Sequence, residues 1–154
     1  MNTSKIMNPM RLLALVLLIV LFSAFTPNKE VEKGVMIVEF DHLKTENGIV
    51  EVSLYNDGNT FLAAGQAILT KRQKVEQGKV KVVFDNLPFG DYAAVSYHDI
   101  NENSEIDRNF IGIPKEPVAV SRLTKKRFSV PKYQDAKIDF NQTKLIIKMQ
   151  FVEY

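Results

Sequence analysis

Apolar and polar residues alternate with a period of two in several separate stretches of this chain, which is typical of strands with one buried face. The alternation is clearest in residues 49–55, 79–84 and 145–151. Residues 35–41 combine one apolar face with a mixed one, and residues 91–97 follow a turn as a further predicted strand. Beyond the first 25 residues, no window repeats apolar side chains with helical spacing over a dozen positions. The pattern therefore predicts an all-β domain.

Turn sequences separate the predicted strands. Asn47-Gly48 is a strong hairpin signal, because both residue types tolerate a positive φ, and it predicts a hairpin between the first two strands. Residues 85–90 form a second predicted turn. Short strands with turns every eight to twelve residues predict an antiparallel β-sandwich of about seven to eight strands.

Residues 62–77 are ambiguous in this pattern. Residues 67–70 fit a short edge strand, whereas the whole segment fits a helix that Gly65 would weaken. Both interpretations stay open at this point.

The first residues have the pattern of a targeting segment. Lys5 and Arg11 precede an apolar run that reaches Phe25, which is long enough for a signal peptide but short of the ~20 residues that span a bilayer. We therefore expect a signal peptide over residues 1–26, a linker over 27–33 and one β-sandwich domain over 34–154. Retention of the leader as a short N-terminal anchor is the alternative, and it would be the chain's contact with a membrane.

Composition and charge narrow the possible partners and the possible sources of stability. The leader contains two of the twenty basic residues and none of the eighteen acidic ones, so the remainder has a net charge near zero. This balance shows no basic stripe and predicts no nucleic-acid partner. The chain has no cysteine, so the domain must depend on an ordinary apolar core.

A loop rich in side-chain oxygens follows the strand that ends near residue 98. Calcium prefers six to eight oxygen ligands, and alternating Asp and Asn residues supply them from a turning chain. The predicted ligands are Asp99, Asn101, Asn103, Glu105, Asp107 and Glu116. Ser104 stands where such loops usually have glycine, and Phe110 stands where they usually have a bidentate glutamate. The alternative is a loop held by Asx turns without an ion.

His98 is the one candidate for acid–base chemistry in this region. Period-two alternation places it on the face of Tyr92, and Asp99 on the opposite face, so the two neighbours do not form a dyad. We expect the imidazole to bond to the loop backbone. A role as a general acid or base is the alternative.

The same residues carry a resemblance to a family. Residues 84–116 include Phe84, Leu87-Pro88 and Gly90, then Tyr92-Ala93 and His98-Asp99, then Asn101, Asn103, Asp107, Asn109, Gly112, Pro114 and Glu116. This order resembles the bacterial exported proteins grouped as the domain of unknown function 2141 family, and the similarity extends over roughly residues 33–152. Two departures are Ser104 in place of a glycine, and the stretch PVAVSRL, which keeps only Ser121 of the family's pattern.

The resemblance implies export and an immunoglobulin-like or transthyretin-like sandwich, with no settled activity. Location in the periplasm, at the outer membrane or outside the cell are all open. A purine-breakdown hydrolase shares the transthyretin-like fold, but its C-terminal tyrosine-arginine-glycine-serine motif is absent here. The sequence favours a non-enzymatic module that binds a protein, a glycan or an envelope component. The alternative is a metal-assisted hydrolase that acts at the polar loop with His98 as acid or base.

Overall fold

A computed structural model describes residue 10, residues 30–125 and residues 129–154. The chain divides into two units, residues 1–30 and residues 31–154. The predicted signal peptide falls almost entirely outside the described residues. Within the described part, no helix is long and apolar enough to cross a membrane.

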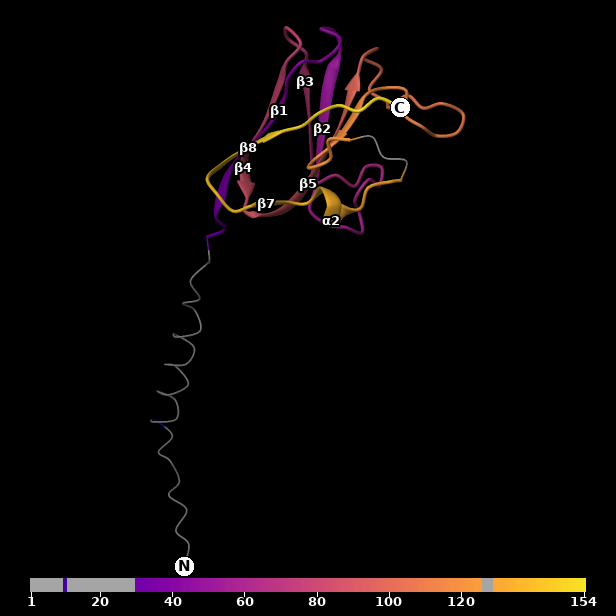
Figure 1. The fold of residues 1–154 in the computed structure, drawn as a ribbon. Helices are drawn as coiled ribbons and strands as arrows, with labels where there is room; N and C mark the ends of the chain where they lie inside the picture. Colours follow the sequence, from indigo (N-terminus) through magenta and orange to yellow (C-terminus); the bar gives the residue numbers. More distant parts are fainter. Residues whose placement is uncertain (1–9, 11–29, 126–128) are drawn as a thin grey trace, which may run out of the picture. The chain divides into compact units, whose positions relative to one another are not determined.

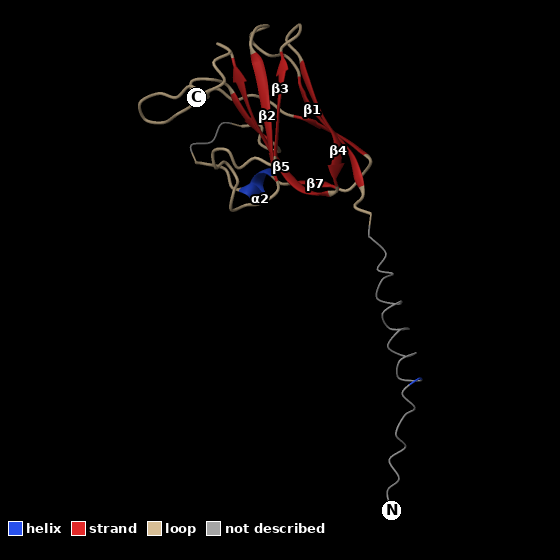
Figure 2. Cartoon of the chain, turned by 180° about the vertical axis from the view of Figure 1, so that it is seen from behind, coloured by secondary structure: helices blue, strands red, loops and turns tan. Residues whose placement is uncertain are grey.

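Residues 31–154 form two β-sheets (Figures 1 and 2). The three-stranded sheet has the order β4-β1-β8, formed by Val80–Pro88, Lys33–Phe40 and Lys144–Lys148. The five-stranded sheet contains β3 (Leu69–Lys74), β2 (Ile49–Tyr55), β5 (Gly90–Asp99) and β6 (Val118–Val120) in that order, and β7 (Ile138–Phe140) pairs with the start of β5. Among the described residues of 31–154, the only helix is α2 (Tyr133–Ala136). The eight strands confirm the predicted all-β sandwich.

The core lies between the two sheets because the alternating apolar side chains turn inward. Met36, Val38 and Phe40 of β1 face Val50 and Val52 of β2 in one buried cluster. Burial of each such side chain stabilises the fold by about 1.5–3 kcal/mol. β8 keeps the predicted alternation as well, with half-buried Leu145 and Ile147 beside exposed neighbours.

The hairpin predicted at Asn47-Gly48 is wrong. β1 pairs with β4 and β8, whereas β2 pairs with β3 and β5, so the turn carries the chain from one sheet to the other. The glycine still has the expected positive φ of 92°. The turn signal reports backbone conformation, but it does not report which strand becomes the partner.

The sandwich is also not entirely antiparallel, because β1 and β8 run parallel. Strands from the two ends of the sequence can pair in either direction, since no short turn constrains them. The ambiguous segment 62–77 contains the edge strand β3, so the helix interpretation is wrong there. The predicted turn at 85–90 is shorter than expected, because β4 continues to Pro88 and β5 begins at Gly90.

Candidate functional site

The polar loop, residues 100–117, leaves the end of β5 and returns to β6. Asp99 at its base is fully buried. Its Oδ1 accepts a hydrogen bond from the Asn103 backbone at 3.0 Å, and its Oδ2 accepts one from the Ser104 backbone at 2.9 Å. The same carboxylate forms an ion pair with the Arg72 guanidinium. Asp99 therefore fixes the first turn of the loop.

Arg72 reaches Asp99 across the outer face of the five-stranded sheet. Strand register places Glu51 between Arg72 on one side and Tyr97 on the other. The guanidinium Nε lies 3.7 Å from a Glu51 carboxylate oxygen, and a terminal nitrogen donates to the Ser104 hydroxyl. Burial, and then the negative charge of Glu51, raise the pKa of Tyr97 to about 12. Arg72 was not among the site residues predicted from the sequence, because its position beside the loop depends on the sheet order β3-β2-β5.

Ser104 explains how the loop turns without the family's glycine. Its φ is 67°, in the left-handed region that glycine adopts at little cost. The backbone N–H of Ser104 donates to Asp99 and its hydroxyl contacts Arg72, and these two bonds offset the conformational cost. The substitution retains the tight turn.

Glu116 closes the other end of the loop. The side chain is buried, with Oε1 accepting from the Ile100 backbone at 3.0 Å and Oε2 accepting from the Asp107 backbone at 3.1 Å. In return, the Asp107 carbonyl accepts from the Lys115 backbone at 2.8 Å. The Glu116 carboxylate thus links the start of the polar loop, at Ile100, to its middle, at Asp107.

The middle of the loop is a series of Asx turns. The Asn103 side chain accepts from the Glu105 backbone at 2.8 Å, and the Asn101 side chain accepts from the Asn103 backbone at 3.2 Å. The Asn101 amide also donates to Asp107 Oδ2 at 2.8 Å. Glu105 is exposed. The side-chain oxygens predicted as ion ligands are therefore engaged largely with N–H groups of the loop itself.

The donor set fits a calcium-type ion only in part. Asp99 and Glu116 direct their oxygens at N–H donors, which leaves Asp107 as the carboxylate beside Asn101 and Asn103. Across residues 30–125 and 129–154, no three His, Cys, Asp or Glu side chains are grouped so as to hold a metal ion. An ion at this position would have to exchange loop hydrogen bonds for ligand bonds. The calcium site stays a prediction.

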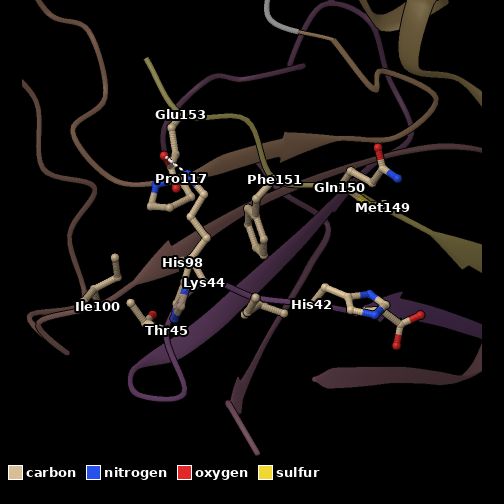
Figure 3. Close-up of a pocket in the computed structure, with 12 residues that line it drawn as sticks. His42, Lys44, Thr45, His98, Ile100, Pro117, Met149, Gln150, Phe151 and Glu153 are labelled. Carbon is tan, nitrogen blue, oxygen red and sulfur yellow. Dashed lines mark hydrogen bonds and ion pairs between the residues drawn. The ribbon is translucent and has the colours of Figure 1, made fainter. Parts of the chain in front are cut away.

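His98 lies on the other face of β5, where it lines a cavity of about 320 Å³ (Figure 3). The imidazole is 2% exposed, and its Nε2 donates to the Asn47 carbonyl at 2.8 Å. Its ring centroid lies 5.8 Å from that of Phe151. The imidazole thus bonds to backbone as expected, but in the segment between β1 and β2 rather than in the polar loop.

The cavity beside His98 has walls of both polar and apolar side chains. Lys44 and Glu153 form an ion pair at 2.5 Å at its rim, drawn as a dashed line in Figure 3. Thr45 also lines the cavity, and its hydroxyl is the one buried side-chain polar atom without a hydrogen-bond partner in the described residues. None of the six predicted metal ligands lines this cavity, so the structure does not bring His98 together with the loop carboxylates.

An apolar groove of about 480 Å³ lies on the outer face of the five-stranded sheet. Val95 of β5 and Val118 and Val120 of β6 contribute sheet side chains to it. Large apolar side chains that are exposed to solvent line the same groove, namely Leu62, Ile111, Ile113, Val130 and Tyr154. This surface was not predictable from the sequence, because its residues come from six segments that only the fold brings together.

The wall of the groove that contains Ile111 and Ile113 is held by the far end of the polar loop. The Asn109 side chain accepts from the backbones of Ile111 and Ile113 at 3.1 Å and 2.9 Å. Arg108 donates to the Gly112 carbonyl at 3.0 Å. The loop is therefore an ordered support for apolar side chains at the surface.

Ser121 fixes the chain just after β6. Its hydroxyl accepts from the Ala94 backbone at 3.0 Å and donates to the Ala136 carbonyl at 2.5 Å. Ser121 is thus a buried link between β5 and α2.

Comparison with known proteins gives a family and no activity. A family model described as "Uncharacterized protein conserved in bacteria (DUF2141)" matches residues 38–148, which include the end of β1, all the other strands and the whole polar loop. No curated protein and no solved structure matches the chain.

Proposed function

The chain belongs to the DUF2141 family of uncharacterized bacterial proteins, and we propose that it is an exported, non-enzymatic binding module. In this proposal the apolar groove engages an apolar part of an envelope component, and the polar loop serves as a rigid wall.

The observation that carries the proposal is the gathering of exposed apolar side chains around one groove. Isolated exposed apolar residues are common on soluble proteins, but contiguous apolar patches mark binding surfaces. Val130 is 79% exposed and Ile111 is 66% exposed, and both line the groove. A ligand that covers these exposed apolar side chains removes them from water, and this burial favours binding.

The order of the loop supports this role. A binding surface loses less conformational entropy when its walls are already fixed. Asp99 and Glu116 fix the two ends of the loop, and Asn109 fixes its tip. The loop needs no ion for its order in this proposal.

The hydrolase alternative has weaker support. An acid–base histidine should lie within hydrogen-bond reach of a substrate held by the other catalytic groups. His98 and the carboxylate of Asp99 lie on opposite faces of β5, and the Nε2 proton of His98 is bonded to Asn47.

Export is supported by the basic and apolar pattern of residues 1–26. N-terminal sequencing of the protein recovered from the cell envelope would test it. A mature terminus between residues 24 and 28 is the expected result, and recovery of the uncleaved chain in the cytoplasm would contradict export.

Nile red, a neutral dye that fluoresces in apolar surroundings, provides the test of the groove. We expect the wild-type protein to enhance its emission, and Ile111→Ser or Val130→Ser to weaken that binding by about three- to tenfold. Phe110→Ser is the matched control, because Phe110 is fully exposed beside Ile111 but does not line the groove. No dye binding, or equal losses in Ile111→Ser and Phe110→Ser, would refute the proposal.

A further inference from the structure

We propose that the ligand of the groove is a long-chain carboxylic acid, held by its apolar chain over β5 and β6 and by its carboxylate at Arg108 or Lys125. The inference rests on the proposed function and specifies the ligand of that site.

The charge of the groove indicates the head group. Arg108 and Lys125 both line it, and no Asp or Glu side chain does. Among the described residues, neither of these two cations forms an ion pair with an acidic side chain. Tyr154, the last residue of the sequence, also lines the groove, and its terminal carboxylate is one negative charge there. The two cations exceed this single anion, so the described lining is net positive and complementary to an added anion.

Arg108 is suited to hold a carboxylate in place. One guanidinium nitrogen, Nη1, already donates to the Gly112 carbonyl, so the side chain is anchored in the loop wall. A guanidinium has five N–H donors in a planar fork that matches the geometry of a carboxylate. The remaining donors can bind a ligand without loss of the anchoring bond.

The size and lining of the groove indicate the rest of the ligand. A volume of about 480 Å³ lies in the range of small-molecule sites, which is about 300–1,000 Å³. The sheet contributes only valine side chains to the groove, from Val95, Val118 and Val120. Such a surface offers a flexible hydrocarbon chain contact area without polar groups that need partners.

A peptide fits this surface less well. Peptides that bind beside a sheet usually add a strand to a free edge. The outer edge of β6 is already paired, because the Val118 and Val152 backbones exchange hydrogen bonds of 3.0 Å and 2.8 Å. A peptide would thus find no open backbone edge at β6.

Displacement of Nile red from the full-length protein by decanoate, dodecanoate and dodecan-1-ol would test the inference. We expect dodecanoate to bind about tenfold more tightly than decanoate, because it buries two more methylene groups. We also expect it to bind about three- to tenfold more tightly than dodecan-1-ol at low salt, with the difference reduced at high salt.

Two variants locate the carboxylate. The double variant Arg108→Gln/Lys125→Gln should bind dodecanoate and dodecan-1-ol equally well, while Lys74→Gln on the exposed strand β3 should behave like wild type. Lys125→Gln alone should remove part of the difference and does not disturb the bond from Arg108 to Gly112. A selectivity for dodecanoate that survives the double variant would overturn the inference.

The outcomes separate the two proposals. Equal binding of dodecanoate and dodecan-1-ol by the wild-type protein would overturn the carboxylate inference but leave the apolar groove as a binding surface. If neither Nile red nor decanoate, dodecanoate or dodecan-1-ol binds the protein, both the carboxylate inference and the proposed binding groove are overturned. Displacement of Nile red by an acidic, leucine-rich peptide but not by dodecanoate would replace the carboxylic acid with a protein partner.

Discussion

Replacement of Asp99 by alanine tests the central claim about the polar loop, namely that protein groups hold it. The carboxylate is fully buried and binds the backbone N–H groups of Asn103 and Ser104 and the Arg72 guanidinium. Asn103 keeps a second acceptor on Asn101, but the Ser104 N–H would lose its bond to Asp99.

The expected loss of stability follows from these contacts. A hydrogen bond to a charged group contributes about 1.5–3 kcal/mol, and removal of one partner of a buried ion pair costs about 3–5 kcal/mol. The Arg72 side chain is 30% exposed, so water can solvate the guanidinium that remains. We therefore expect Asp99→Ala to lose about 3 kcal/mol, which lowers the melting temperature of a domain of this size by about 12 °C.

Thermal unfolding followed by circular dichroism, first with chelator and then with calcium, is the assay. We expect the same loss in both buffers, because the partners of Asp99 are protein groups. Glu51→Ala is the control, since Glu51 contacts the same arginine at 3.7 Å but is 22% exposed, and it should cost less than about 1 kcal/mol. An Asp99→Ala protein that melts within about 2 °C of wild type in chelator would refute the reasoning.

Three further predictions concern the loop, a turn and a half-buried tyrosine. Because the loop is ordered by its own hydrogen bonds, calcium should not raise the melting temperature more than magnesium does, and a calcium-selective rise that Asp107→Ala abolishes would establish the ion site instead. Gly48→Ala should lower the free energy of unfolding by more than about 2 kcal/mol, because φ is 92° at this residue and the added Cβ would lie 2.5 Å from the Asp99 carbonyl oxygen. Gly65→Ala is the control: φ is 70° there but the space around it is open, so the loss should be only about 1 kcal/mol. Equal losses in denaturant unfolding of the two variants would contradict this reasoning. Burial raises the Tyr97 pKa to about 12 from 10.0, so the unfolded chain releases this proton first and stability should fall as the pH rises from about 10 towards 12. Tyr97→Phe should reduce that fall in alkaline unfolding experiments, and an unchanged pH dependence would refute the assignment.

The strands were predictable because burial of one face leaves a period-two pattern in the sequence. Val50, Val52 and Leu54 alternate with Glu51 and Ser53, whereas in the first strand Met36, Val38 and Phe40 form an apolar face opposite a mixed one, so each strand could be located without knowledge of its partners. Strand pairing was not predictable in the same way. The Asn47-Gly48 turn joins two sheets, and β8 pairs with β1 although more than a hundred residues separate them in the sequence.

The candidate site likewise has features that the sequence could predict and others that it could not. The sequence alone placed Asp99 and His98 on opposite faces of one strand, because the side-chain period of two is a local property of the backbone. It could not show that Arg72 is the partner of Asp99, since that pairing depends on the order of β3, β2 and β5. The family itself was recognised from the loop motif, and the match over residues 38–148 confirms it.

The sequence by itself determined the all-β class, the position of most strands and the unusual polarity of one loop, because these properties depend on neighbouring residues. Only the tertiary structure decided what that polarity does: Asp99 and Glu116 bind N–H groups of their own loop. The apolar groove also exists only in the folded chain, since Leu62, Ile111 and Val130 lie far apart in the sequence. Contacts between distant segments depend on how the sheets assemble, and no local pattern specifies that assembly.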